Sequence, residues 1–440
     1  SDVCSSDLAD SSGFSIAYRI MGDQERDLLW VPGVVSNVDL MWDGPPRAFL
    51  EQMANHFRVI IFDRRGQGLS DRFDGVPSFE ERCDDLHAVM TAANSKRSIL
   101  FGVSQGGPIG VMFAATYPDM VEHLILYSSF PRFAWSENYP TRPKLDEQVE
   151  ARVKNWGTGK ILVSMTPSQA DDPEFVDWAA RYERMSATPN TIRTQTLADG
   201  GIDVRDLLPQ IRVPTTVLQR RDDASNLREN GRFLADNIPG AVYLELPGAD
   251  HPPYAGDYRR IIEEIVFASQ KESTEPDAKR HLATALFTDI EDSTKRMAQL
   301  GDRKWHRLLD QHDKLTRDIV AQYRGRFVKS TGDGVLATFD GPERAVRCAC
   351  QVVSEVEALG LRVRAGPHAG EVEQRSNDDL TGLAVHIAAR VMATGAGGVV
   401  RVTRTIVDLV NGSGLRFDPC GHHDLKGIDH KMELYEPRLN

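Results

Sequence analysis

Residues 98–107 read SILFGVSQGG, and this stretch decides the fold of the first half of the chain. The apolar run before Gly102 predicts a buried strand, and the residues after Ser104 predict a helix. Gly102 and Gly106 permit a sharp strand-to-helix turn that leaves Ser104 exposed at the strand end. The helix N-terminus behind the serine favours a developing negative charge. The stretch therefore predicts a nucleophilic serine at the edge of a doubly wound sheet.

Short apolar runs alternate with helical patterns around this turn, as in a sheet built from βαβ units. Runs rich in Val, Ile and Leu are typical of parallel strands buried on both faces. The predicted strands are Phe14–Ile20, Leu28–Val31, Val59–Phe62, Ile99–Val103, Leu124–Tyr127, Thr215–Leu218 and Val242–Leu246. Residues 132–207 break the rhythm with Trp, Pro and charged helical segments, which predicts a cap over the carboxyl edge of the sheet.

The opening residues 1–8, SDVCSSDL, contain no initiator Met and resemble a translated sequencing adapter. We therefore leave them out of the fold, expect Cys4 to be foreign, and assign the first domain to residues 9–269.

Length and composition limit the function classes. The chain has 440 residues, more than the about 250–300 that a single core usually holds, so more than one domain is expected. The net charge of −12 argues against a nucleic-acid-binding face. No apolar run approaches the roughly 18 residues of a membrane span. Five cysteines without CxxC spacing predict neither a disulfide framework nor a zinc site, so we expect a cytoplasmic protein.

Two residues that follow later strands complete a catalytic set with Ser104. Asp223 follows the strand Thr215–Leu218, and His251 follows Val242–Leu246. In this order a histidine can take the serine proton while an aspartate fixes the imidazole tautomer. Asp222 is adjacent and is the alternative acid.

This pattern resembles the α/β-hydrolase family over about 260 residues. Residues 62–72, FDRRGQGLSDR, resemble the family's Gly-rich loop, and residues 31–34, VPGV, resemble its oxyanion loop. The resemblance implies that the backbone N–H groups of Val34 and Gln105 stabilise the oxyanion. It implies hydrolysis of a small ester; the alternative is a domain that binds a small hydrophobic ligand without turnover.

A polar, charged stretch at 270–280, QKESTEPDAKR, predicts a linker. Beyond it, residues 281–440 begin with a strand that ends in FTDIEDST (287–294), and KSTGDG (329–334) predicts a hairpin with Asp333 at its tip. Asp289 lies at the end of the first of these strands. Carboxylates on neighbouring strand ends can hold divalent cations.

Together with AVHIAAR (384–390) and LKG (425–427), these motifs resemble the catalytic domain of class III adenylyl and guanylyl cyclases. The resemblance implies an α+β, ferredoxin-like domain with two Mg²⁺ or Mn²⁺ ions per site. Asp289 and Asp333 would hold the ions with the carbonyl of Ile290. Arg390 matches the transition-state arginine, His386 stands where Asn is usual, and Lys426 matches the triphosphate-binding lysine.

Lys329 and Asp379 match the purine-reading pair of this family. A lysine donates to adenine N1 and an aspartate accepts from the 6-amino group, whereas guanine offers the opposite pattern. We therefore expect ATP rather than GTP as substrate, and cyclic AMP as product. In the family each site combines residues of two subunits, which implies a homodimer. Asp292 stands in place of a usual glycine.

The sequence thus predicts an adenylyl cyclase joined to an esterase-like hydrolase, which we expect to regulate the cyclase through the linker. Two alternatives stay open: a hydrolase domain that only senses a ligand, and an esterase with an inactive cyclase domain.

Overall fold

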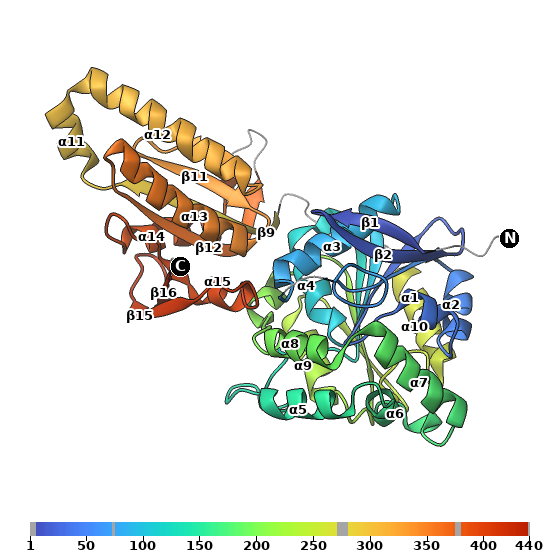
Figure 1. The fold of residues 1–440 in the computed structure, drawn as a ribbon. Coiled ribbons are helices and arrows are strands. Elements are labelled where there is room, and N and C mark those ends of the chain that lie inside the picture. The colour runs from blue at the N-terminus through green and yellow to red at the C-terminus, as the bar shows by residue number, and fades with distance from the viewer. Residues whose placement is uncertain (1–5, 73–74, 271–279, 375–379, 439–440) are drawn as a thin grey trace. The chain divides into compact units, whose positions relative to one another are not determined.

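The structure is a computed structural model in which we describe residues 6–72, 75–270, 280–374 and 380–438 (Figure 1). The chain divides into two compact units, 1–276 and 277–440. The division falls within the predicted linker, whose central residues 271–279 lie outside the described part. Each unit is treated separately below.

The N-terminal unit is built on an eight-stranded sheet with the order β1-β2-β4-β3-β5-β6-β7-β8. The strands are β1 (Asp7–Ser11), β2 (Phe14–Met21), β3 (Asp27–Val31), β4 (Arg58–Phe62), β5 (Ser98–Val103), β6 (Val121–Tyr127), β7 (Thr215–Arg220) and β8 (Val242–Leu246). From β4 to β8 all neighbours are parallel. All seven predicted strands are present, and the predicted doubly wound fold is confirmed.

The exclusion of residues 1–8 from the fold is wrong for two of them. Asp7 and Leu8 belong to β1, which pairs antiparallel with β2, with Leu8 opposite Ala17. A strand of five residues with only two buried side chains carries too weak an apolar pattern to be seen in the sequence.

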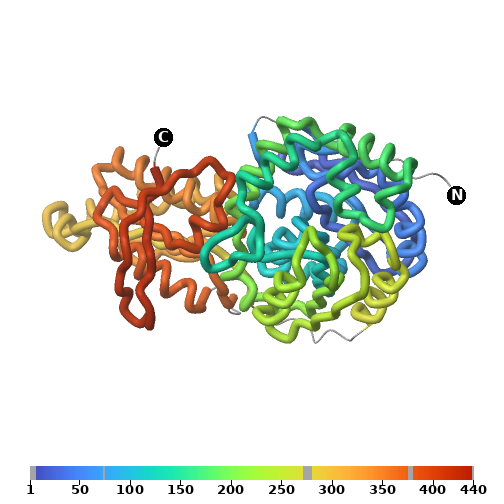
Figure 2. Tube along the Cα trace, turned by 90° about the horizontal axis from the view of Figure 1, so that it is seen from below, coloured from blue at the N-terminus to red at the C-terminus, as the bar shows by residue number. Residues whose placement is uncertain are grey.

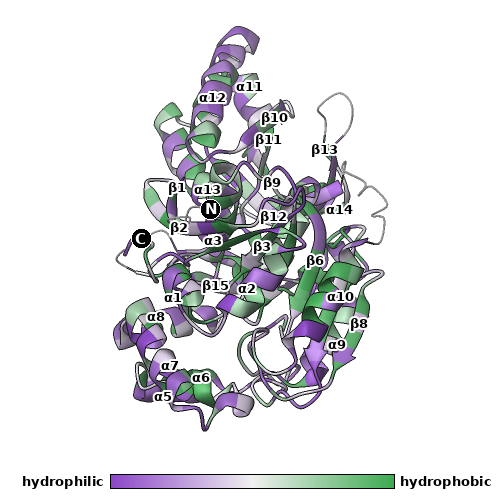
Figure 3. Cartoon of the chain, turned by 90° about the vertical axis from the view of Figure 1, so that its right-hand side faces the viewer, coloured by the Kyte–Doolittle hydropathy of each residue, from purple (hydrophilic) through white to green (hydrophobic). Residues whose placement is uncertain are grey.

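Alternate residues of the central strands face two helical layers. Leu28 and Trp30 of β3 share a core with Phe49 of α2 (Arg47–Ala54) and Ile261 of α10 (Tyr258–Gln270). On the other face, α3 (Phe79–Ala92) and α4 (Gly106–Thr116) pack together. Strands buried on both faces are mostly apolar, and β6 carries Leu124, Ile125 and Leu126 after the polar Glu122 and His123. Figure 3 colours the chain by hydropathy and labels this strand.

The segment between β6 and β7 forms the predicted helical cap. Its helices are α5 (Leu145–Asn155), α6 (Lys160–Ser164), α7 (Pro173–Ser186) and α8 (Pro189–Asp199). On α7, Trp178 and Tyr182 stack with ring centroids 4.8 Å apart. Trp178 also donates from its indole N–H to the carbonyl of Leu40, 3.0 Å away, in α1 (Val38–Trp42). These contacts attach the cap to the loop region that follows β3.

The C-terminal unit is an antiparallel α+β domain, as predicted. Its main sheet has the order β10-β11-β9-β12-β13, with a smaller sheet β14-β16-β15. The strands are β9 (Arg280–Ile290), β10 (Arg326–Ser330), β11 (Gly334–Phe339), β12 (Val363–Gln374), β13 (Leu380–Thr381), β14 (Val402–Thr403), β15 (Phe417–His423) and β16 (Met432–Pro437). Figure 2 traces the last two in dark red.

Helices cover both faces of the main sheet. Ala283 and Ala285 of β9 pack against Ala384 and Ala388 of α14 (Leu383–Ala393). Helices α12 (Asp302–Gln322) and α13 (Pro342–Val356) pack together, and α13 contacts β9 and β12. Among the described residues, the other α-helices are α9 (Arg228–Asn237) in the N-terminal unit and α11 (Ser293–Leu300) and α15 (Arg404–Leu409) in the C-terminal unit.

The four described cysteines, Cys83, Cys348, Cys350 and Cys420, are free thiols. In the described part of the chain, no helix is both long and apolar enough to cross a bilayer.

Two candidate active sites

Ser104 occupies the predicted turn between β5 and α4. Its backbone has φ of 53°, in the left-handed region that residues other than glycine rarely adopt. Gly106 is required because a Cβ there would lie 2.1 Å from the carbonyl oxygen of Val31. The backbone N–H of Ser104 donates to the carbonyl of Tyr127, 2.9 Å away on β6. The turn therefore holds the serine hydroxyl at the carboxyl edge of the sheet.

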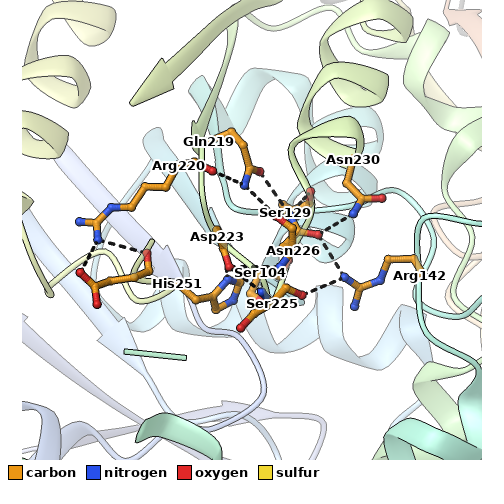
Figure 4. A network of polar contacts seen from close by, with 11 residues as sticks. Ser104, Ser129, Arg142, Gln219, Arg220, Asp223, Ser225, Asn226, Asn230 and His251 are labelled. Carbon is orange, nitrogen blue, oxygen red and sulfur yellow. Dashed lines mark hydrogen bonds and ion pairs between the residues drawn. The ribbon is translucent and has the colours of Figure 1, made fainter. Parts of the chain in front are cut away.

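Asp223 and His251 form a buried hydrogen-bonded pair beside this serine (Figure 4). The Nδ1 atom of His251 lies 2.7 Å from Oδ2 of Asp223, and their side chains are 8% and 0% exposed. The neighbouring Asp222, the alternative acid, is exposed. The structure thus brings Asp223, and not Asp222, to the histidine.

The environment of Asp223 keeps its carboxyl ionised. Burial alone would raise its pKa, but the charge and hydrogen bond of His251 lower it, as do the hydroxyl of Ser128 and the N–H of Ser225. The net effect is a lowered pKa. Because this carboxylate only accepts hydrogen bonds, His251 must donate from Nδ1, which leaves Nε2 free to accept a proton.

Ser104 and His251 line one cavity of about 520 Å³, including its open mouth. The other lining residues are Trp30, Pro32, Gly33, Val34, Val35, Met41, Val103, Leu162, Met165, Tyr182, Pro252, Pro253 and Tyr254. None of these residues, all in the described part of the chain, is Asp, Glu, Lys or Arg. A cavity of this composition suits an uncharged, mostly apolar group.

Val34 and Gln105 are the predicted oxyanion donors, and both lie near the serine. Val34 lines the cavity, and Gln105 is the residue that caps α4. In the described ranges, neither backbone N–H donates to a protein acceptor, so both donors are available to a substrate oxygen.

Supporting residues under the serine were not predicted. The hydroxyl of Ser129 donates to the carbonyl of Ser104 at 2.9 Å. Asn226 donates from its side-chain amide to the carbonyl of Ser129, also at 2.9 Å. These contacts join residues far apart in the chain (Figure 4), and no local sequence pattern marks them.

In the C-terminal unit, Asp289 and Asp333 meet at the ends of adjacent strands. Asp289 is opposite Gly334 in the β9–β11 register, and the N–H of Ile290 donates to the carbonyl of Asp333 at 2.9 Å. Burial, and then the charge and hydrogen bonding of Asp333, raise the pKa of Asp289, while Arg364 opposes the rise. The hairpin prediction is confirmed, with Asp333 in the turn between β10 and β11.

Both carboxylates have protein partners that the sequence did not reveal. Arg364 on β12 donates two hydrogen bonds to Oδ2 of Asp289, at 2.9 Å from Nε and 2.6 Å from Nη2. The Ser293 hydroxyl donates to Oδ2 of Asp333 at 2.5 Å. These bonds occupy one carboxylate oxygen of each acid, so a cation bound here would have to share or displace them.

Among the described residues, no group of three or more His, Cys, Asp or Glu side chains could hold a metal. A metal here would therefore need oxygen ligands beyond these two carboxylates, such as the carbonyl of Ile290 or the phosphates of a substrate.

The other predicted cyclase residues lie on the surface. His386 and Arg390 are exposed on one side of α14, where Leu383 is 62% exposed one turn earlier. Lys329 on β10 and Lys426 after β15 are also exposed. These four residues are thus not gathered in a closed pocket with the two aspartates.

Asp379 and Asp292 are two further residues that the sequence singles out. Asp379 lies outside the described residues. Asp292, which replaces a usual glycine, has φ of 57°, in the left-handed region that aspartate tolerates better than most residues.

Comparisons with known proteins agree with this division. Residues 48–251 match the family described as serine aminopeptidase, S33, and residues 277–436 match the adenylate and guanylate cyclase catalytic domain. The N-terminal fold is similar to that of a solved hydrolase from Pseudomonas aeruginosa PA01. The two share 24% identity and a TM-score of 0.52, over 62% of this chain and 100% of the other.

Two curated relatives match one part of the chain each. The pimeloyl-[acyl-carrier protein] methyl ester esterase of Chromobacterium violaceum is 28% identical over 215 residues, which cover 46% of this chain and 80% of the relative. The Rhizobium meliloti protein named "Putative adenylate cyclase 3" is 28% identical over 167 residues, covering 36% of this chain and 28% of the relative. The chain therefore joins an α/β-hydrolase domain to a C-terminal catalytic domain of the class III adenylyl and guanylyl cyclase family.

Proposed function

We propose that the C-terminal domain converts ATP into 3′,5′-cyclic AMP and pyrophosphate. The observation that carries this proposal is the meeting of Asp289 and Asp333 at two adjoining strand ends, where Asp289 lies opposite Gly334, the residue after Asp333. A class III cyclase domain takes a nucleotide substrate, and this is the arrangement that its chemistry needs.

The two carboxylates would hold two Mg²⁺ or Mn²⁺ ions, with the carbonyl of Ile290 as a further ligand. Such ions lower the pKa of the ribose 3′-hydroxyl and neutralise the phosphates. The hydroxyl attacks the α-phosphorus, its proton leaves, and the bond to pyrophosphate breaks. The protein contributes position and positive charge: Lys426 toward the triphosphate and Arg390 toward the charge that develops in the transition state.

The residues that complete this site come from a second copy of the chain. His386 and Arg390 are exposed beside the apolar Leu383, as expected of an interface that faces another subunit. In a two-fold homodimer, Asp289 and Asp333 of each subunit would face helix α14 of the other subunit. The dimer would therefore contain two sites, each shared between the subunits.

Base selection follows from Lys329 and Asp379. A lysine donor and a carboxylate acceptor match adenine N1 and its 6-amino group, and each would oppose guanine. A buried polar group left unpaired costs about 1–3 kcal/mol, so ATP should exceed GTP by about tenfold or more in kcat/KM.

Purified full-length protein incubated with ATP or GTP, and with Mg²⁺ or Mn²⁺, tests the cyclase proposal. Cyclic AMP formed at least tenfold faster than cyclic GMP, both measured by chromatography after the same reaction time, would support it. Equal rates with both nucleotides would show that the base-reading pair is misassigned. The absence of any cyclic product with either metal would refute the cyclase activity.

For the N-terminal domain we propose hydrolysis of a small uncharged ester. Ser104 attacks the carbonyl carbon and gives its proton to Nε2 of His251. The N–H groups of Val34 and Gln105 stabilise the oxyanion, and the imidazolium then protonates the departing alcohol. Water repeats the sequence on the acyl-enzyme and releases the acid. The hydrogen-bonded pair of His251 and Asp223 favours hydrolysis over ligand sensing without turnover. Ligand binding alone does not require a histidine that is oriented by a carboxylate.

Nitrophenyl butyrate, compared with a nitrophenyl ester whose acyl chain ends in a carboxylate, tests the substrate class. The charge-free cavity wall predicts turnover of the neutral ester and a loss of about tenfold or more with the charged one. Preference for the charged ester would overturn the proposed substrate class. If the protein hydrolysed neither ester, the proposed hydrolysis itself would be overturned.

A further inference from the structure

One face of the cap helix α8 reaches into the loops that carry the oxyanion donors. Asp199, 2% exposed, ends this helix. Its Oδ1 accepts a hydrogen bond from Arg82 at 2.5 Å, and its Oδ2 accepts one from the side-chain amide of Gln105 at 2.9 Å. Arg64 lies 3.9 Å from Oδ2. One cap carboxylate therefore faces two buried arginines and the residue that follows the nucleophile.

Arg64 connects this carboxylate to the first oxyanion donor. Its Nη1 donates to the carbonyl oxygen of Gly33 at 2.9 Å. That carbonyl and the N–H of Val34 belong to the same planar peptide and point in opposite directions. A cation fixed on the carbonyl side therefore sets the direction of the Val34 N–H and increases its strength as a donor.

Gln105 connects the same carboxylate to the second donor. Its side chain is 4% exposed and is held by the bond to Asp199, while its own backbone N–H is the oxyanion donor next to Ser104. Fixing the side chain of a residue restricts its backbone, so the second donor is also oriented from the cap.

A parallel contact lies one turn earlier on α8. The side-chain amide of Gln67 donates to the carbonyl of Val34 at 3.0 Å and to Oε1 of Gln195 at 2.7 Å. Its own Oε1 accepts the N–H of Ser36 at 2.9 Å. Because Gln195 and Asp199 are four residues apart, they share one helix face. The adjacent carbonyls of Gly33 and Val34 in the oxyanion loop thus both have partners linked to this face.

We propose that Asp199 is a positioning residue that holds both oxyanion donors in their productive geometry, so that the cap and the oxyanion hole are assembled together. This inference rests on the proposed hydrolysis at Ser104. A substrate or ligand that moves α8 would change the rate of the chemical step, even without touching the catalytic residues.

The test compares Asp199→Asn with wild type in the full-length protein, using nitrophenyl butyrate. Loss of one oxyanion donor costs about 10²–10³ in kcat in well-studied hydrolases, and partial misorientation of two should lower kcat by about 10–100-fold with KM changed less than threefold. Asp177→Asn, at an exposed acid of the cap helix α7, is the matched control and should keep wild-type kinetics.

Transition-state affinity separates positioning from a structural role. An alkyl boronic acid, which forms a tetrahedral adduct with Ser104, should lose affinity in parallel with kcat/KM in Asp199→Asn. The affinity of the unliganded cavity for an apolar dye should be the same in Asp199→Asn as in wild type. Gln105→Ala removes the amide contact without leaving a buried arginine unpaired, so it should reproduce a smaller loss in kcat even if Asp199→Asn folds poorly.

If Asp199→Asn and Gln105→Ala both kept the wild-type kcat and the wild-type affinity for the boronic acid, the positioning role of Asp199 would be overturned. The proposed hydrolysis at Ser104 would still stand. An inactive wild-type protein that also fails to bind the boronate would overturn the proposed hydrolysis and the inference with it.

Discussion

The two sites of this chain differ in how closely the structure gathers the residues proposed for each. In the hydrolase domain the histidine–aspartate pair is already formed, buried and linked by a 2.7 Å contact. In the cyclase domain the two aspartates are brought together, but Arg364 is bonded to one of them, and His386 and Arg390 remain exposed. A site that closes within one chain can be organised by its own fold, whereas the cyclase site, in the proposed homodimer, would depend on assembly. The following experiments test that difference.

The largest expected effect is at the nucleophile. Ser104→Ala should lower ester turnover by about 10⁴-fold or more, because the attacking oxygen is lost, while cyclase turnover without added ligand stays at the wild-type level. Release of nitrophenol and formation of cyclic AMP measure the two activities on the same sample. Ser168→Ala, at an exposed serine of the cap, is the control. Unchanged ester hydrolysis in Ser104→Ala would place the activity elsewhere.

Asp333→Ala should abolish cyclase activity, with a loss of about 10³-fold or more, because one of the two carboxylates proposed to hold the cations is removed. Ester turnover should be unaffected. Asp340→Ala removes an exposed acid just after β11 and controls for the loss of a negative charge. Cyclic AMP formation at more than a tenth of the wild-type rate in Asp333→Ala would contradict the proposed site.

Mixing two inactive variants tests the division of the cyclase site between chains. Asp289→Ala and Arg390→Ala proteins, unfolded and refolded together, should form mixed dimers in about half of the molecules. Each mixed dimer has one intact site of two, so about a quarter of the wild-type activity should return. Mass spectrometry of the intact dimers confirms mixing. Complete mixing without activity would show that the site is not shared.

We expect His368 to make the stability of the cyclase domain depend on pH. It is buried, with Nδ1 2.8 Å from the Thr403 hydroxyl, and burial lowers its pKa to about 4. The unfolded chain takes up this proton below pH of about 6.5, so unfolding is favoured as the pH falls from 6.5 toward 4 and is unaffected above 6.5. The loss amounts to about 3 kcal/mol.

Urea unfolding, read from amide exchange of β12 peptides at pH 7.5 and pH 4.5, measures this loss. His368→Asn keeps a polar group but cannot be charged, so the acid-induced drop in its midpoint should be smaller than in wild type. An equal drop in both proteins would mean that other groups cause the acid sensitivity.

The smallest expected effect concerns Arg364. Because its guanidinium occupies a carboxylate oxygen of Asp289, Arg364→Gln should tighten Mn²⁺ binding in the absence of nucleotide by about threefold to tenfold. Loss of the free Mn²⁺ signal in electron paramagnetic resonance measures the affinity. Arg362→Gln is the matched control, since Arg362 donates to the carbonyl of Gly397 instead. Equal or weaker affinity in Arg364→Gln would show that the ion pair does not compete with the cation.

Much of this arrangement was predictable because it depends on local patterns. The strand before Ser104, the glycines around it and the hairpin that carries Asp333 are each encoded within about ten residues, where chain geometry limits the choices. The order of Ser104, Asp223 and His251 then follows from the topology of a parallel sheet.

The supporting contacts were not predictable for the same physical reason. Asp199 meets Gln105 across 94 residues, and Arg364 meets Asp289 across 75. Arginines and aspartates are common on surfaces, and nothing in their neighbouring sequence shows which of them will be buried together. The choice between Asp222 and Asp223 also required the structure, because only the path of the loop after β7 decides which one turns inward.

The left-handed backbone of Ser104 has a consequence for how this domain can change over time. A side chain held at φ of 53° destabilises the native state by about 1–3 kcal/mol relative to a relaxed residue. Glycine would adopt the same turn without strain, giving a sturdier protein with the cavity preserved and the nucleophile gone. Selection for durability alone would therefore favour a ligand-binding domain without the nucleophile, and the proposed hydrolysis gives the strained serine its use.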